Sequence, residues 1–314
     1  MRTQSAIRVV AFVAVGIFLA LLPRVADPYL LYLASVTAVY LIIALSLNLL
    51  LGYTGQISLG HAGFAAVGAY ASAILSKQLG LGIGFAAFFG AGLAAAVGLL
   101  VGLPALKVRG YYLALVTLAF GEIVQVILRQ AKFLTGGNDG LAVVAPRLPG
   151  LSMSVAHSTY YLLWAVALFC VWFVRNIVRG RSGRAFACIR DSEIAAQSVG
   201  ISLTRYKLYA FIVSAFLAGL AGALYSILNQ YVHPDDFDFG RSIAYLMMVV
   251  VGGLGTLAGS AIGALLLAIL PEALRRFQDY QELIFAALLL GCIIFVPQGI
   301  AGLARYLPHR SKRK

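Results

Sequence analysis

The sequence predicts an all-α fold, a polytopic integral membrane helical bundle that forms a single domain over residues 1–314. Two observations predict this fold class. Apolar residues occupy 61% of the 314 positions and charged residues only 11%, whereas a soluble domain averages roughly 45–50% and about 25%. The apolar residues also gather in runs close to the roughly 20 residues that a bilayer crossing requires. This composition excludes both an ordinary soluble protein and a disordered chain.

Prolines, glycine clusters and charged residues divide the chain into about ten expected transmembrane segments. The first of these lacks a cleavage-site pattern and is expected to be a retained helix instead of a signal peptide. The eighth and ninth are short and meet at a glycine-rich junction, so broken or re-entrant helices are the alternative to two full crossings. The ten segments lie near residues 7–22, 29–51, 61–76, 81–105, 111–130, 159–178, 206–230, 242–256, 257–271 and 281–297.

The distribution of charge predicts the orientation. With ten spans and both termini cytoplasmic, 16 Lys and Arg residues fall inside and 8 outside, while two acidic residues fall inside and eight outside. Cytoplasmic loops are enriched in Lys and Arg. The net charge of +13 therefore indicates membrane topology, and no nucleic-acid partner is expected. The inside residues form a cytoplasmic loop at about 179–207 and a basic C-terminal tail at 303–314.

Small residues recur at helical spacing. Gly98 and Gly102 form one GxxxG pattern, and Gly255 and Gly259 form another. Such pairs let two helix backbones approach closely in a membrane. The pattern predicts tight helix packing, with faces that slide during a transport cycle as the alternative.

The segment 48–61 interrupts two apolar runs with polar side chains and glycines. Non-helical backbone at membrane depth survives only where it is buried in protein or lines a watery cavity. The segment therefore predicts a broken helix or re-entrant turn beside a translocation path, with Asn48, Gln56, Ser58 and His61 as candidate path residues. A plain cytoplasmic loop is the alternative. Part of the segment, Leu-Gly-x-x-Gly at 51–55, is weakly repeated as Val-Gly-x-x-Gly at 251–255.

Glu122 is a carboxylate well inside the expected span 111–130. An ionisable residue in a membrane is costly and by default indicates function. Glu122 is therefore a further candidate for the translocation path. The alternative is a structural glutamate inside the bundle, with Gln125 and Arg129 as partners on the same helix face.

The cytoplasmic loop contains a predicted short helix at 192–200. Acidic Asp191 and Glu193 suit the positive end of its dipole, and Gly200 suits its C-terminal stop. A compact helix between two spans could transmit force from a cytoplasmic partner. An incidental helix in a basic loop is the alternative. Two polar outside loops, 135–140 and 233–239, could dock a partner or cap a pore, or they are solvated turns.

Several sequence patterns are missing. The chain has no phosphate-binding GxxxxGK pattern, no HExxH, no GxSxG and no paired carboxylates within a span. Its four histidines and three cysteines show no metal-ligand spacing. We therefore expect no catalytic residue, no metal and no cofactor. Energy for transport must come from another polypeptide or from an ion gradient.

Five stretches together resemble permease subunits of branched-chain amino-acid ABC importers of the Liv type, and more closely the M-type subunit. Any one of these glycine-rich stretches alone is not specific, but the set runs through most of the chain. The stretches are SLNLLLGYTGQISLGHAGF at 46–64, GYYLALVTLAFGEI at 110–123, TGGNDGL at 135–141, and the segments 183–200 and 251–259.

The resemblance implies a permease subunit, not an enzyme, in a heteromeric importer of the bacterial inner membrane. Its partners would be two ATP-binding subunits, a second homologous permease subunit and a periplasmic substrate-binding protein. Glu193, Ala195, Ala196 and Gly200 match the ATPase-coupling positions of ABC permeases, with an offset of one residue. The implied substrates are leucine, isoleucine and valine. The alternatives are urea, short amides or aromatic acids for the same class of permease, or an ion-coupled secondary transporter.

Overall fold

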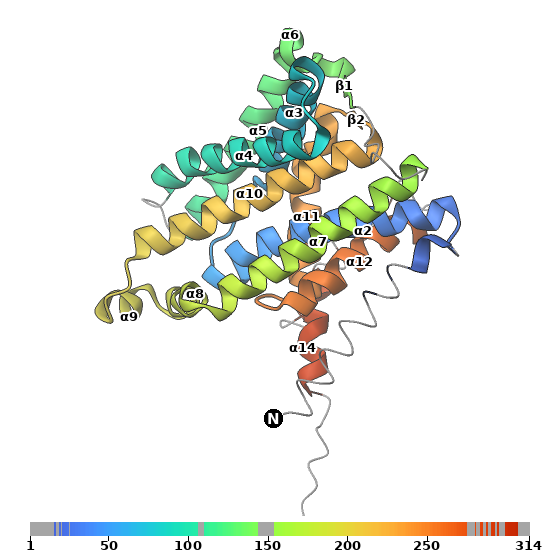
Figure 1. The fold of residues 1–314 in the computed structure, drawn as a ribbon. Helices are drawn as coiled ribbons and strands as arrows, with labels where there is room; N and C mark the ends of the chain where they lie inside the picture. The colour runs from blue at the N-terminus through green and yellow to red at the C-terminus, as the bar shows by residue number, and fades with distance from the viewer. Residues whose placement is uncertain are drawn as a thin grey trace, which may run out of the picture.

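The computed structural model describes residues 26–105, 110–143, 154–274 and 299–306, with single positions between 16 and 24 and between 280 and 294. Helices dominate this part of the chain (Figure 1). The expected first and last spans lie largely outside the described residues. Among the described helices, five are long and apolar enough to cross a membrane. These are Pro28–Tyr53, Ile83–Pro104, Tyr111–Gln130, Val155–Arg179 and Leu203–Asn229.

The elements follow one another with few extended connections. In chain order they are α2 (Pro28–Asn48), the π-helix η1 (Leu49–Tyr53), α3 (His61–Leu79), α4 (Ile83–Ala105), α5 (Tyr111–Gln130), α6 (Lys132–Thr135), the 3-10 helix η2 (Gly137–Asp139), β1 (Leu141–Ala142), α7 (Val155–Arg179), α8 (Arg181–Asp191), α9 (Glu193–Ser198), α10 (Leu203–Asn229), β2 (Tyr231–Val232), the 3-10 helix η3 (Pro234–Phe237), α11 (Phe239–Gly252), α12 (Leu257–Ala273) and α14 (Gly299–Tyr306).

The expected helix bounds in the described regions agree with the structure to within a few residues. Helix α7 begins at Val155 instead of residue 159, because the Ser154 side chain caps its N-terminus by accepting a hydrogen bond from the His157 backbone N–H. The expected eighth and ninth spans are separate short helices, α11 and α12, of 14 and 17 residues. Gly253 and Gly255, both with positive φ, make the turn between them.

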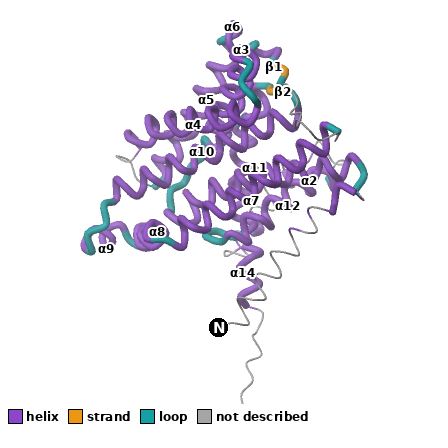
Figure 2. The backbone as a smooth tube through the Cα atoms, viewed as in Figure 1, coloured by secondary structure: helices purple, strands orange, loops and turns teal. Residues whose placement is uncertain are grey.

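Helix α10 lies at the centre of the bundle and packs on α2, α3 and α4, and α2 packs in turn on α7 and α12 (Figure 2). Glycines permit the closest of these contacts. A Cβ atom on Gly68 of α3 would overlap the backbone of Gly219 in α10, and one on Gly98 of α4 would overlap Ala215. The predicted role of the GxxxG glycine Gly98 in tight helix packing is confirmed.

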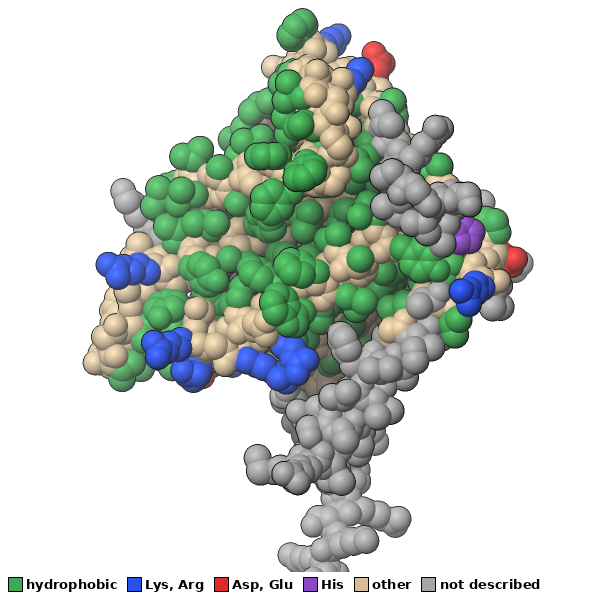
Figure 3. Space-filling model, viewed as in Figure 1, with side chains coloured by type: hydrophobic (Ala, Val, Ile, Leu, Met, Phe, Trp, Pro, Cys, Tyr) green, Lys and Arg blue, Asp and Glu red, His purple; other side chains and the backbone are tan. Residues whose placement is uncertain are grey.

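The outer surface of the bundle is apolar. Phe85 is 71% exposed, Ile123 58% and Trp172 55%, and hydrophobic side chains cover most of the face in Figure 3. Lys and Arg side chains gather along one edge of that face, beside α8 and α9. An apolar belt of this extent must be covered by lipid or by another protein.

A small β-ladder of two residues per strand joins the two polar loops that the sequence predicts to lie outside, within a fold that is otherwise helical. Strands β1 and β2 pair antiparallel, with Leu141 opposite Val232. His233 Nε2 donates to the Asn138 carbonyl at 2.7 Å, and the Tyr231 hydroxyl donates to the Asp139 carbonyl. Backbone N–H and C=O groups in short loops have no hydrogen-bond partner within a helix. Here the two loops supply partners for each other. The two loops thus form one cap at one end of α3 and α10.

Candidate functional site

The polar segment that the sequence singles out is a genuine break in the helix. After Asn48 the chain continues as the π-helix η1 and then leaves helical geometry over residues 55–60, before α3 begins at His61. Gly55 has a φ of 71°, which a side chain would strain. Gln56 is buried, and its amide donates to the Thr54 hydroxyl at 3.0 Å and to the Lys207 carbonyl at 3.4 Å. The break is therefore anchored to the start of α10.

Asn48 joins this break to the turn between α11 and α12. Its side-chain amide donates to the Thr256 carbonyl and to the Ser260 hydroxyl, both at 2.8 Å. Its carbonyl oxygen accepts from the Gly255 backbone N–H, also at 2.8 Å. A Cβ on Gly52 would overlap the nitrogen of Gly255. The two weakly repeated Gly-x-x-Gly stretches thus lie against each other, and Asn48 joins them at 1% exposure.

His61 sits in a buried hydroxyl cluster at the start of α3. Its Nε2 lies 2.8 Å from the Ser46 hydroxyl and 3.1 Å from the Ser214 hydroxyl, and its Nδ1 lies 3.3 Å from the Ser58 hydroxyl. Ser46 and Ser214 also exchange hydrogen bonds with each other's backbone carbonyls. Like Asn48 and Gln56, His61 and Ser58 are buried and hydrogen-bonded within the chain. In this conformation the cluster joins α2, α3 and α10.

The segment between α8 and α10 contains the predicted short helix as α9. Ser192 caps its N-terminus by accepting from the Ala195 backbone N–H, and the Glu193 carboxylate pairs with the Lys207 ammonium at 2.6 Å. Ala196 is buried. Gly200, with a φ of 82°, follows the helix end as predicted.

The outer surface of α9 and the residue after it expose two large apolar side chains beside polar ones. Ile194 is 79% exposed and Val199 71%, and Ala195 and Gly200 are also exposed. Exposed apolar side chains on a helix at the basic edge of the molecule, away from the apolar belt, are typical of a protein-binding surface.

Helix α8 and its Arg190 were not predicted. The run 181–191 is rich in charge and was assigned to a basic loop, but α8 buries Phe186 and Ile189 against its neighbours. Arg190 then donates from Nη1 to the Gly52 carbonyl of η1 at 3.0 Å. A Cβ on Gly55 or Gly255 would also contact its side chain. The alternation of apolar and charged residues was the available signal. Arg190 thus links α8 to the helix break at η1.

Glu122 lies on the exposed surface of α5, so the alternative of a structural glutamate inside this chain's bundle is wrong. Its expected partners bind elsewhere: Arg129 pairs with Asp235 at 2.8 Å, and the Gln125 amide donates to the Pro234 carbonyl at 3.3 Å. Glu122 also lines a shallow recess together with Ser242 of α11. Hydropathy alone does not tell which helix face is covered, so the sequence could not show this.

Long apolar helices, a broken span and a short helix exposed at the basic edge define a multi-pass membrane protein built for transport. Residues 29–296 match the family described as branched-chain amino acid transport system, permease component. The chain belongs to this family, and such a component is a transport subunit instead of an enzyme.

Curated relatives agree with this assignment. The chain is 36% identical over 297 residues to the high-affinity branched-chain amino acid transport system permease protein LivM of Salmonella typhimurium and, equally, to LivM of Escherichia coli, with 87% of this chain and 70% of each relative covered. It is 27% identical over 289 residues to the permease protein LivH of Escherichia coli, with 84% of this chain and 91% of LivH covered. No solved structure matches the chain.

Proposed function

We propose that this chain is one of two homologous permease subunits of an ATP-driven importer for leucine, isoleucine and valine in the bacterial inner membrane. Its partners are a LivH-like permease, two ATP-binding subunits and a periplasmic binding protein that delivers the substrate. The similarity to both LivM and LivH supports a pair of related permeases. The whole chain forms one transmembrane domain with ten spans and cytoplasmic termini, an orientation supported by the basic edge beside α8 and α9 (Figure 3).

The observation that carries the proposed mechanism is the exposure of Ile194 and Val199 at α9, together with the hydrogen bond from Arg190 of α8 to Gly52 of η1. An ATP-binding subunit that covers Ile194 and Val199 would remove both from water. Ala195 and Gly200, which are exposed, then join the coupling contact, while the buried Ala196 and the Glu193–Lys207 ion pair hold α9 in place. Closure of the two ATP-binding subunits would displace α8 and α9 together, and Arg190 would pass this displacement to the break at Gly52.

The path residues divide into two groups on this proposal. Asn48, Gln56, Ser58 and His61 hold the break, so they control the path by changing its shape. Glu122, on the exposed face of α5, faces the second permease subunit, because a carboxylate exposed to lipid would be costly. Substrate then crosses between the two permeases.

The first experiment tests the energy source. Uptake of leucine by vesicles that contain the chain with the second permease and both ATP-binding subunits, supplied with the binding protein, should require ATP. It should persist when an uncoupler collapses the proton gradient. An importer for urea, short amides or aromatic acids would give ATP-driven uptake of those solutes and none of leucine. Uptake without the ATP-binding subunits that stops with the uncoupler would contradict the proposal and favour an ion-coupled transporter.

The second experiment tests the coupling helix. Gly200→Pro is incompatible with a φ of 82°, and Glu193→Lys opposes Lys207. Both variants should reach the membrane and hydrolyse ATP without leucine uptake. Glu193→Gln removes the charge without reversing it, so its loss of uptake should be smaller. Normal uptake in both variants would rule out the coupling role of α9.

A further inference from the structure

A cavity of about 340 Å³ opens among α2, α10, α11 and α12. Its lining comes from the first half of α2, the last residues of α10 and α12, and the first turn of α11. The coupling segment precedes α10, so the cavity lies at the opposite end of that helix. On the proposed orientation this is the outside of the membrane, where a binding protein delivers substrate. The volume is at the small end of the roughly 300–1,000 Å³ range of ligand sites.

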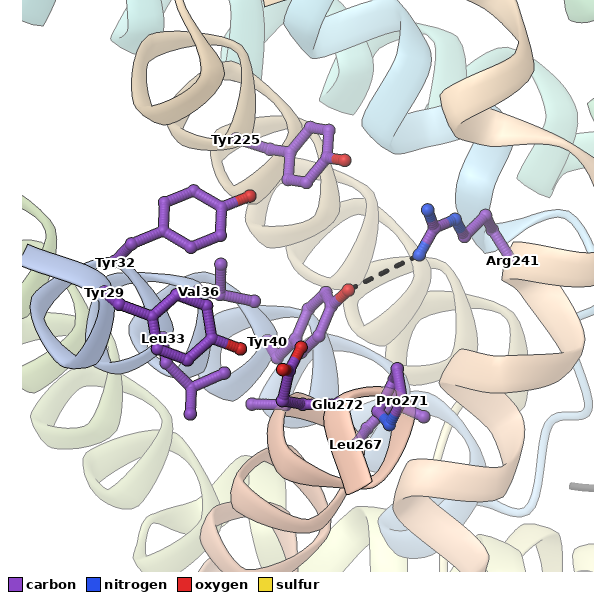
Figure 4. A pocket seen from close by; sticks show the side chains of 11 residues that line it. Tyr29, Tyr32, Leu33, Val36, Tyr40, Tyr225, Arg241, Leu267, Pro271 and Glu272 are labelled. Carbon is purple, nitrogen blue, oxygen red and sulfur yellow. Dashed lines mark hydrogen bonds between the residues drawn. The ribbon is translucent and has the colours of Figure 1, made fainter. Parts of the chain in front are cut away.

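The inner part of the cavity presents a guanidinium group. Figure 4 shows Arg241 directed toward the hydroxyl groups of Tyr40 and Tyr225. Its Nη1 donates to the Tyr40 hydroxyl at 3.5 Å, a long hydrogen bond. In the part of the chain that the structure describes, no carboxylate forms an ion pair with Arg241. A guanidinium has five N–H donors in a planar fork that matches a carboxylate, so this group is suited to bind an anion.

The wall and the mouth of the cavity have different chemistry. Val36, Leu267 and Ala268 are buried and line an apolar wall. At the mouth, Tyr32 is 45% exposed, and the exposed Glu272 contributes a carboxylate. The inner part of the cavity therefore offers a cation beside an apolar surface.

We propose that this cavity binds a free aliphatic α-amino acid on its way to the translocation path. The proposal rests on the proposed function and adds a site to it. Arg241 holds the carboxylate, and the wall of Val36, Leu267 and Ala268 covers the aliphatic side chain. Phosphate is a poorer occupant because the wall is apolar. An anionic lipid head group is the competing occupant that the test below distinguishes.

The cavity also lies next to the proposed path. Arg241 lines the cavity, and its neighbour Ser242 lines the recess that contains Glu122. The first turn of α11 thus separates the two. The Asp238 side chain caps that turn by accepting from the Arg241 backbone N–H at 2.8 Å. A movement of α11 would join the amino-acid site to the path between the permeases.

The test is binding of leucine to the assembled permease and ATP-binding subunits, without binding protein, by saturation-transfer difference NMR, which detects weak binding. Arg241→Gln should weaken leucine binding about tenfold or more, as expected for loss of a charged hydrogen-bonded pair, and Arg241→Lys should weaken it less. On the unaltered protein leucinamide, which lacks the carboxylate, should compete poorly. This discrimination should disappear in Arg241→Gln.

Arg129→Gln is the matched control, because Arg129 lies outside the cavity, and its leucine binding should not change. Basal ATP hydrolysis and thermal melting show whether each variant is folded. Unchanged leucine binding in Arg241→Gln would overturn the proposal, as would loss of a bound phospholipid in native mass spectrometry with leucine binding intact. If the unaltered importer took up no leucine with ATP and binding protein, the proposed function would fail. In that case, leucine binding that depends on Arg241 would still support the proposed site, so the two failures can be told apart.

Discussion

The helix break at residues 48–61 and the proposed coupling segment, α8 and α9, differ in which side chains they bury. The break buries polar side chains, and α9 exposes apolar ones. At the break, polar side chains are buried, and Asn48 makes three hydrogen bonds at 2.8 Å. At α9, apolar Ile194 and Val199 are exposed while Glu193 pairs with Lys207. A buried polar group requires partners within the chain, whereas an exposed apolar group requires a partner outside it. The hydrogen bonds of the break are satisfied within this chain, whereas α9 leaves Ile194 and Val199 exposed for the proposed partner.

The largest effect is expected at the break. Asn48→Ala leaves the Gly255 N–H without its buried partner, which costs about 1–3 kcal/mol. It also removes one hydrogen bond each from the Thr256 carbonyl and the Ser260 hydroxyl, which keep their bond to each other. We expect roughly 2–4 kcal/mol of destabilisation in all, measured as a lower melting temperature in detergent. Asn176→Ala, on an exposed position of α7, should change stability by no more than about 0.5 kcal/mol. Equal melting temperatures for the two variants would show that the break is not held from within.

The link between the two regions should show a smaller effect on stability but a clear effect on function. Arg190→Gln removes the charged donor to the Gly52 carbonyl. ATP hydrolysis stimulated by the loaded binding protein should fall several-fold, while the ATP-binding subunits still co-purify. Arg184→Gln, an exposed position on the same helix, should behave like the unaltered protein. Loss of the ATP-binding subunits in Arg190→Gln would instead make Arg190 part of the docking surface.

The smallest effect is expected at the outside cap. Arg129 and Asp235 pair at 2.8 Å, but their side chains are 47% and 64% exposed. Exposed ion pairs contribute about 0–1 kcal/mol, so Arg129→Gln should shift the melting temperature little and leave leucine uptake unchanged. A large loss of stability would show that the cap, like the break, is held from within.

The sequence predicted the parts that depend on local chemistry. A run of glycines and polar residues between apolar segments is enough to predict a break at Asn48, and Gly200 is enough to end α9. The partners of these residues could not be predicted, because Gly255 is more than 200 positions from Asn48 and becomes its neighbour only through helix packing.

Two further features needed the structure for different reasons. Glu122 lies on a helix that is apolar on several faces, and lipid-facing and protein-facing residues have similar hydropathy in a membrane. From the sequence, Arg241 contributes only to the number of charges that are expected outside the membrane. Its role as the inner end of a cavity depends on Tyr40, Tyr225 and Glu272, which come from three other helices.

Helix α10 has 27 residues without interruption, a length of about 40 Å. One end follows the coupling segment and the other contributes Tyr225 to the amino-acid cavity. Thermodynamic linkage makes any coupling between the two ends reciprocal. Suppose that nucleotide binding to the ATP-binding subunits changes the affinity of the cavity for an amino acid by some factor. An amino acid in the cavity then changes the affinity of those subunits for nucleotide by the same factor. The importer would then sense on its cytoplasmic side whether cargo has arrived outside.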